Sequence, residues 1–90
     1  MSKIKISRPS EEELEKMDVH HWSPWGCEVS KFPWEYDSEE TCYIKEGRVI
    51  VETEEGDKVE IKKGDLVTFP KGMKCTWDVK EKISKVYKFN

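Results

Sequence analysis

One carboxylate and one thiol have spacings that suggest chemistry in this chain of 90 residues. Glu40 begins an E-x6-G pattern that ends at Gly47, and Cys75 ends a G-D-x4-P-x-G-x2-C pattern that begins at Gly64. A carboxylate that is buried away from water can serve as a general acid or base, and a thiolate binds soft metals such as Zn²⁺ or Cu(I). Glu40 is therefore the candidate catalytic residue. No metal is favoured, and Glu40 and Cys75 are the candidate ligands of the alternative, a divalent metal.

The histidines and the other cysteines are not spaced as metal ligands or disulfide partners. His20 and His21 are adjacent, and neighbouring side chains of a strand point to opposite faces. We therefore expect both to be exposed to solvent or hydrogen-bonded within the protein, without a metal. Cys27, Cys42 and Cys75 form no C-x-x-C pair, and their odd number argues against a disulfide framework. We therefore expect reduced thiols, with Cys27 and Cys42 packed as small hydrophobic side chains.

Turn residues divide the chain from Phe32 onward into short strands. Turns that contain glycine recur at intervals of roughly 8–12 residues, which is typical of a sandwich or barrel. A turn at Glu46 and Gly47 is expected to end one strand and begin the next. The predicted strands are residues 41–45, 48–52, 58–61, 66–69, 74–80 and 83–89. Together with the segments before them, they predict an all-β domain of about seven or eight strands.

The N-terminal part of the chain predicts a strand, a helix and an irregular segment. Residues 3–7 are expected to form a short strand. A helix is predicted over residues 11–17, because Ser10 and Glu13 have the spacing of a capping box and good helix formers follow. Residues 20–31 are rich in Trp, Pro and Gly, so an irregular or edge-strand segment is expected there.

Taken together, the two patterns resemble the two motifs of the cupin superfamily. Those motifs, G-x5-H-x-H-x(3,4)-E-x6-G and G-x5-P-x-G-x2-H-x3-N, bring three histidines and a glutamate to one metal ion. Here Trp34 and Tyr36 stand at the first two histidine positions, and Cys75 stands at the third. Glu40 keeps the glutamate position, whereas Val79 replaces the final asparagine. The resemblance implies a cupin-type double-stranded β-helix, a jelly-roll barrel with one short N-terminal helix, without a complete metal site.

Within that superfamily, the chain resembles a small single-domain group of largely unassigned function. It is also similar to the cupin units of ureidoglycine aminohydrolase and of an ethanolamine-utilisation protein. The stretches that carry this closer resemblance are residues 34–36, 40–43 and 64–70. The resemblance implies one cupin domain over residues 1–90, with an N-terminal strand and helix over about residues 1–19 and the barrel over about residues 22–90.

The barrel that the resemblance implies would enclose a pocket with aromatic walls. Successive side chains of a strand point to opposite faces, so an inward Glu40 would bring Cys42 inward, and an inward Cys75 would bring Trp77 inward. The predicted lining residues are Trp34, Tyr36, Glu40, Cys42, Cys75 and Trp77. Such a wall is either a platform for a small ring or the core of a small barrel. Glu40 is correspondingly either an acid/base residue or a structural carboxylate with hydrogen-bond partners.

Composition and charge narrow the class of protein. The chain has 16 Lys and Arg against 19 Asp and Glu, a net charge of −3, whereas a nucleic-acid-binding protein would more often be strongly basic. No apolar run approaches the roughly 20 residues of a membrane span, and no signal-peptide core is present, so we expect a cytoplasmic protein with no membrane partner. The dominance of Lys over Arg and the absence of Gln are typical of hyperthermophile proteins.

Two functions are open on this basis. The first, which we favour, is binding of a small polar metabolite in the aromatic pocket without any cofactor. The second is an enzyme that acts on a small polar or nitrogen-containing substrate, with Glu40 as acid or base and a weakly held divalent metal as an option. A structural role is a further alternative, because an edge strand at residues 3–7 can pair with a second copy to form a homodimer.

Overall fold

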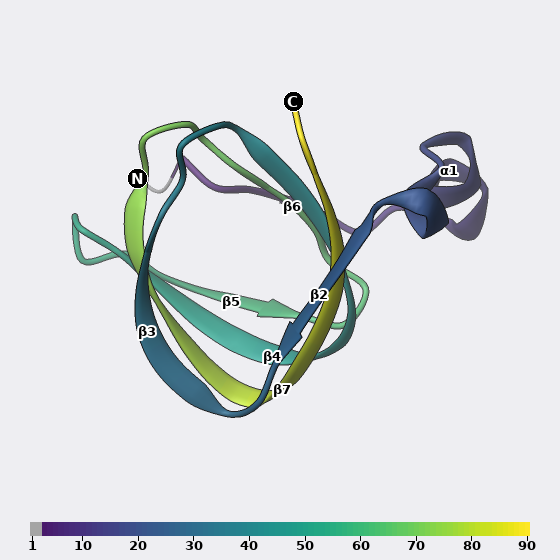
Figure 1. Ribbon diagram of the computed structural model, residues 1–90. Coiled ribbons are helices and arrows are strands. Elements are labelled where there is room, and N and C mark those ends of the chain that lie inside the picture. Colours follow the sequence, from purple (N-terminus) through teal and green to yellow (C-terminus); the bar gives the residue numbers. More distant parts are fainter. Residues whose placement is uncertain (1–2) are drawn as a thin grey trace.

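Residues 3–90, the part of the chain that the structure describes, form seven strands, a short α-helix and one 3-10 turn in this computed structural model. Figure 1 shows the strands wrapped around a common interior, with α1 projecting at one side. The elements are β1 (Lys5–Ser7), α1 (Glu11–Lys16), η1 (Val19–His21), β2 (Ser23–Cys27), β3 (Ser30–Glu35), β4 (Glu40–Thr53), β5 (Lys58–Lys62), β6 (Leu66–Phe69) and β7 (Lys74–Phe89). The predicted all-β class is confirmed. None of the described helices is long and apolar enough to cross a membrane.

β4 and β7 are the long strands that organise the fold. They contain 14 and 16 residues, and they pair antiparallel along their length. The first part of β4 pairs with β6 and its second part with β5, whereas the first part of β7 pairs with β3 and its second part with β2. Two layers result, one in the order β1-β6-β4-β7-β2 and the other in the order β5-β4-β7-β3. The long strands pass from one layer into the other and enclose the interior between them.

β4 continues through Gly47, where the sequence predicted a turn between two strands. The pairing register with β7 shifts between Ile44 and Val49, and Gly47 has a φ of +91°. A Cβ atom on Gly47 would lie 2.1 Å from the carbonyl oxygen of Lys82. The predicted turn was therefore wrong, because glycine permits a bulge that bends one continuous strand into the second layer. β7 is likewise continuous across the predicted break between residues 80 and 83.

The predicted helix cap and the hairpin turn are confirmed. The backbone N–H of Glu13 donates to Ser10 Oγ, and the backbone N–H of Ser10 donates to the Glu13 carboxylate, which is a reciprocal capping box. The helix ends at Lys16, one residue earlier than predicted, with Met17 as its C-cap. Gly56, with a φ of +89°, lies in the hairpin turn between β4 and β5.

The N-terminal segment contacts the turn between β5 and β6 through an ion pair and a hydrogen bond. β1 is shorter than the predicted strand over residues 3–7, and it pairs with β6 at the edge of its layer. Arg8 Nε lies 3.4 Å from the buried carboxylate of Asp65, and the Arg8 guanidinium donates to the carbonyl oxygen of Lys63 at 2.7 Å. Asp65 also accepts the backbone N–H of Lys62 at 2.9 Å. The homodimer expected from this edge stays a prediction.

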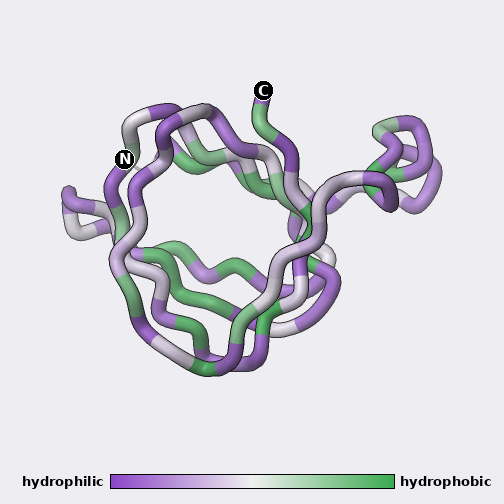
Figure 2. The backbone as a smooth tube through the Cα atoms, viewed as in Figure 1, coloured by the Kyte–Doolittle hydropathy of each residue, from purple (hydrophilic) through white to green (hydrophobic). Residues whose placement is uncertain are grey.

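Apolar side chains from both layers meet in the interior. Figure 2 shows hydrophobic and hydrophilic residues alternating along the strands, as expected where one face of a strand is turned inward. A smaller cluster of Leu14, Val19 and Val86 joins the helical segment to β7. The buried core between the layers includes Cys42, Ile44, Val49, Val51, Ile61, Val67, Phe69, Val79 and Ile83.

Candidate functional site

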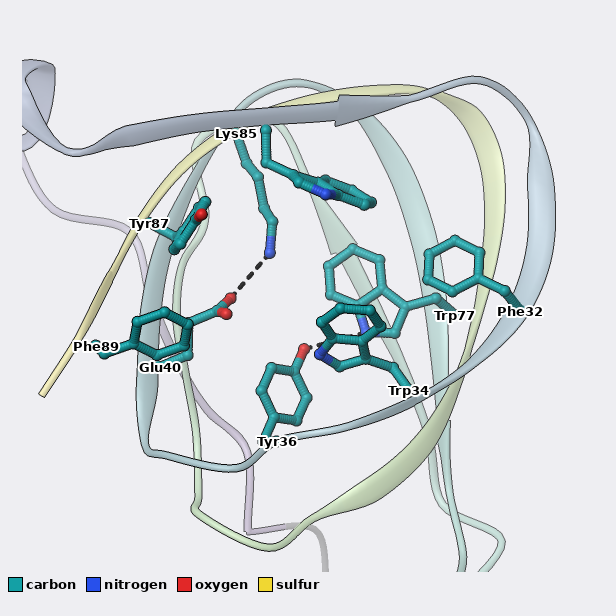
Figure 3. Close-up of a pocket in the computed structure, with 9 residues that line it drawn as sticks. Phe32, Trp34, Tyr36, Glu40, Trp77, Lys85, Tyr87 and Phe89 are labelled. Atoms are coloured by element: carbon teal, nitrogen blue, oxygen red, sulfur yellow. Dashed lines mark hydrogen bonds and ion pairs between the residues drawn. The ribbon is translucent and has the colours of Figure 1, made fainter.

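A cavity of about 280 Å³ lies on the inner side of β2, β3 and β7. Aromatic rings form most of its wall, and one carboxylate and one ammonium group supply its charges (Figure 3). The lining residues are Trp25, Phe32, Trp34, Tyr36, Glu40, Trp77, Lys85, Tyr87 and Phe89.

Strand alternation explains why β7 contributes several of these side chains. Lys85, Tyr87 and Phe89 occupy every second position, so they project from the same face of the second half of β7. Trp77 projects from the first half of the strand, which belongs to the other layer. Because β7 runs from one layer into the other, both halves of the strand turn these side chains toward one cavity.

Glu40 and Lys85 form a buried ion pair on the cavity wall. Lys85 Nζ donates to Glu40 Oε2 at 2.9 Å, and the side chains of Lys85 and Glu40 are only 7% and 6% exposed, respectively. Figure 3 shows the two groups reaching toward each other. Removing two charges from water is costly, and the pair is tolerated because each group supplies the counter-charge of the other. The cavity therefore contains a charged donor and a charged acceptor whose net charge is zero.

Three aromatic rings surround the ammonium group of Lys85. Its Nζ lies 4.7 Å from the ring centre of Trp77, 5.1 Å from that of Trp25 and 5.6 Å from that of Tyr87. Each cation–π contact of this kind contributes roughly 0.5–2 kcal/mol, with the larger values in desolvated sites. The rings thus hold the ammonium in place beside Glu40.

Tyr36 and Trp77 form the wall beside the ion pair. The Trp77 indole N–H donates to the Tyr36 hydroxyl at 3.2 Å, and the Tyr36 ring stacks on Phe69 with ring centres 4.6 Å apart. Burial, and then the negative charge of Glu40, raises the pKa of Tyr36 well above its usual value. Tyr36 is therefore a neutral phenol at physiological pH.

The six residues predicted to line the pocket divide into two groups. Trp34, Tyr36, Glu40 and Trp77 line the cavity, whereas the two thiols lie in the adjacent core. Burial raises the pKa of the Cys42 thiol to about 12 and that of the Cys75 thiol to about 11. Both residues share the inward face of their strands as expected, but their short side chains are covered by the surrounding core and do not reach the cavity.

The metal centre typical of the cupin superfamily does not fit these donors. Trp34 offers no good metal ligand, and the Tyr36 hydroxyl is protonated and already accepts a hydrogen bond. Glu40 is paired with Lys85, whose positive charge opposes a metal ion at the same carboxylate. Within residues 3–90, no three His, Cys, Asp or Glu side chains are grouped so that they could hold a metal ion.

Sequence reasoning did not identify five of the lining residues. For Lys85 a signal was present, because it lies two residues from both Ile83 and Tyr87 and therefore on the apolar face of an alternating strand. A lysine on such a face needs a buried counter-charge. Trp25 lies in the segment that was expected to be irregular or an edge strand, whereas Tyr87 and Phe89 lie in the strand predicted over residues 83–89, whose inward face was not assigned. The five are Trp25, Phe32, Lys85, Tyr87 and Phe89.

The adjacent histidines lie away from the cavity, near the end of the helical segment. Both are exposed, and His21 contacts the carboxylate of Asp18 through its Nδ1 atom. The expectation of an exposed or locally satisfied pair agrees with this placement.

Several solved structures share this fold. A DUF861-family protein from Thermotoga maritima is 51% identical, with a TM-score of 0.96, and the match covers 98% of this chain and 100% of that one. The EutQ protein of Clostridium difficile is 25% identical with a TM-score of 0.65, over 71% of this chain and 50% of that one, so the match spans only half of that protein. An ethanolamine utilisation protein Q from Salmonella typhimurium, 20% identical with a TM-score of 0.62, shares the fold over 93% of this chain and 66% of that one. A comparison with curated proteins gave no match.

The family comparison agrees with these structures. A family model described as the EutQ-like cupin domain matches residues 14–87. The predicted cupin fold and the predicted likeness to an ethanolamine-utilisation protein are therefore confirmed. This chain belongs to the EutQ-like cupin domain family.

Proposed function

We propose that this protein binds a small organic molecule in the aromatic cavity and needs no metal ion to do so. The observation that carries the proposal is the Glu40–Lys85 pair, which faces a cavity whose remaining wall is aromatic. Ligand sites are commonly apolar clefts in which a few placed polar groups fix the orientation of the ligand. Here the pair provides that polar group, and Lys85 already balances the charge of Glu40.

Two large aromatic side chains at the cavity remain exposed to solvent. Trp34 is 47% exposed and Phe89 is 62% exposed, and both line the cavity. Aromatic rings bury a large apolar area when a second ring stacks on them, with roughly 0.5–1.5 kcal/mol from the ring pair in addition. These rings support a ligand platform rather than a wall that only completes the core.

The volume limits the ligand to a small molecule. About 280 Å³ is close to the lower end of small-molecule sites, which span roughly 300–1,000 Å³. A single ring with one or two polar substituents fits this space, whereas a nucleotide or a folded peptide segment does not.

A second function, catalysis with Glu40 as acid or base, is favoured by one observation. The Glu40 carboxylate lines the cavity and uses only Oε2 in its contact with Lys85. Its other oxygen is therefore the atom that would accept a proton from a small polar or nitrogen-containing substrate. Turnover of a bound ligand, lost in Glu40→Gln while binding persists, would distinguish an enzyme from a binding protein.

Tryptophan fluorescence provides the direct test of binding. Trp25, Trp34 and Trp77 line the cavity, and Trp22 does not. A screen of small ring metabolites should yield compounds that change the emission and raise the melting temperature. Trp34→Ala should weaken their binding about three- to tenfold through the lost ring contact. Trp22→Ala is the matched control, and it should leave the affinity unchanged once circular dichroism has shown that both variants are folded.

Elemental analysis tests the metal-independent part of the proposal. Protein purified without an affinity tag and without a chelator should contain far less than one metal ion per chain. Addition of EDTA should leave ligand binding unchanged. Near-stoichiometric metal that is lost in both Glu40→Gln and Cys75→Ser would overturn metal independence. A broad metabolite screen without any compound that perturbs the cavity tryptophans would overturn the binding role.

A further inference from the structure

We infer that the cavity selects a neutral, planar ligand that presents a hydrogen-bond donor and an acceptor on one edge, as a carboxamide or a cyclic amide does. The inference rests on the proposed function and names the ligand class of the same cavity. The Glu40–Lys85 pair forms hydrogen bonds with the polar edge of the ligand. The aromatic wall contacts its flat faces.

Both members of the pair have hydrogen-bonding capacity beyond their mutual contact. An ammonium group has three N–H donors, and Lys85 gives one of them to Glu40. A carboxylate has two acceptor oxygens, and the contact uses only Oε2 of Glu40. The free donors and the free acceptor lie side by side because the two groups are 2.9 Å apart. An amide edge satisfies both at once, since its carbonyl accepts from Lys85 while its N–H donates to Glu40.

A charged ligand meets a like charge at this pair. An anion that approaches Lys85 comes close to the Glu40 carboxylate, and a cation that approaches Glu40 comes close to the Lys85 ammonium. The repulsion is stronger in a desolvated cavity than in water. Two phenols, Tyr36 and Tyr87, complete the ionisable groups of the wall, and the raised pKa of Tyr36 keeps that residue neutral. The pair therefore discriminates by repulsion as well as by attraction.

The arrangement of rings adds a second reason against amines. Aromatic cages bind ligand cations through the faces of several rings. In this cavity the rings of Trp25, Trp77 and Tyr87 already surround the ammonium of Lys85. A ligand cation would have to displace that ammonium from both its rings and its carboxylate. A neutral planar ligand leaves these contacts intact and stacks on the exposed ring of Trp34 instead.

Three pyridine compounds of nearly equal size test the inference. Nicotinamide carries a neutral amide, nicotinic acid an anionic carboxylate, and 3-(aminomethyl)pyridine a cationic amine at pH 7.5. Titration of the full-length protein, followed by tryptophan fluorescence and by calorimetry, should give nicotinamide an affinity at least tenfold higher than that of either charged compound.

Single substitutions in the pair should change this order in opposite directions. Glu40→Gln leaves the Lys85 charge unopposed and should shift the preference toward nicotinic acid by at least tenfold relative to the unmodified protein. Lys85→Met leaves the Glu40 charge unopposed and should shift it toward the amine by a similar factor. Matched controls are Glu39→Gln and Lys88→Met, which are neighbouring residues outside the cavity lining and should keep the original order.

The outcomes separate this inference from the proposed function. Equal or tighter binding of nicotinic acid or the amine by the unmodified protein would overturn the selection for neutral ligands, while small-molecule binding would stand. If the Glu40 and Lys85 variants keep the original order of affinities for the three compounds, the pair does not determine ligand selection. That result would also overturn the inference. Failure to bind any of the three compounds would overturn it as well, and the metabolite screen then decides separately whether the binding role survives.

Discussion

Lys85 and Glu40 are separated by 45 residues in the sequence, and their charged atoms lie 2.9 Å apart inside the barrel. The contact joins the second half of β7 to the first residue of β4, so it ties the two long strands together on their inner side. The chain thus supplies its own cation beside the carboxylate at the cupin glutamate position. We therefore expect the stability of the fold and the proposed ligand recognition both to depend on this one pair.

Loss of one member of the pair should destabilise the fold strongly. Lys85→Met leaves the Glu40 carboxylate buried without a counter-charge, and breaking a buried pair in this way typically costs about 3–5 kcal/mol. Urea unfolding followed by tryptophan fluorescence measures the free energy of unfolding. The matched surface control is Lys80→Met, whose partner Asp78 is 2.8 Å away but only partly buried, and its cost should be below about 1 kcal/mol.

Removal of both charges should cost less than the two single substitutions added together. The double variant Glu40→Gln with Lys85→Met contains no unpaired buried charge, and replacing a whole buried pair is often close to neutral. A double-mutant cycle therefore should give a coupling free energy of at least about 1 kcal/mol. Strictly additive costs would show that the two groups do not depend on each other.

Gly47→Ala should destabilise the barrel by at least about 2 kcal/mol. The residue has a φ of +91°, and the added Cβ would lie 2.1 Å from the carbonyl oxygen of Lys82. A positive φ alone costs an L-residue about 1–2 kcal/mol, and the clash with the backbone adds to it. Gly56→Ala is the control, because φ is +89° there with no atom within 4 Å of the new Cβ. If Gly47→Ala and Gly56→Ala lower the free energy of unfolding equally, the clash between the added Cβ and β7 does not contribute to the loss.

Tyr36→Phe should cost about 1–3 kcal/mol, because it removes the acceptor of the buried Trp77 indole N–H. The environment of Trp77 changes as well, so the fluorescence emission should shift together with the stability. Tyr43→Phe serves as the control, since no hydrogen bond to its hydroxyl is found in the part of the chain that the structure describes. A loss no larger than that of the control would mean that the second contact of the Trp77 side chain, with the Cys75 thiol, suffices without the Tyr36 hydroxyl.

The alternation of apolar residues and the turn glycines predicted the all-β fold well. The capping box at Ser10 and the hairpin at Gly56 followed from local rules that tertiary contacts did not overrule. The break at Gly47 was misread because a positive-φ glycine is compatible with a turn and with a bulge alike. Only the position of Lys82, 35 residues away in the sequence, decides between them.

The site was predicted less completely, for a physical reason. Trp34, Tyr36 and Glu40 follow from motif positions, and Trp77 follows from strand parity. Lys85 lies outside both motifs, and its role depends on a partner 45 residues away. Long-range pairing of this kind has no local signature beyond a lysine on an apolar face.

Only Cys27 should react rapidly with a thiol reagent in the folded protein. The pKa values of Cys42 and Cys75 are raised by burial to about 12 and about 11, so at pH 8 no more than roughly one thiol in a thousand is the reactive thiolate. Cys27 is half-buried. Titration with an aromatic disulfide reagent should detect one fast thiol per chain before denaturant is added and three afterwards. Cys27→Ser should remove the fast phase, and two or more fast thiols in the unmodified chain would contradict the burial of the other two.

The same raised pKa values predict a loss of stability in alkaline solution. Above about pH 9 the thiols of the unfolded chain release protons that the folded chain retains on Cys42 and Cys75, so proton release favours unfolding. The stabilising contribution is complete below about pH 9 and falls as the pH rises toward 11 and 12, with a slope of up to about 1.4 kcal/mol per pH unit for each thiol. Cys42→Ala and Cys75→Ala, measured by urea unfolding between pH 8 and pH 11, should each show a shallower decline than the unmodified protein. Cys27→Ser should retain the full slope, and identical slopes in all four proteins would show that the buried thiols titrate as they do in the unfolded chain.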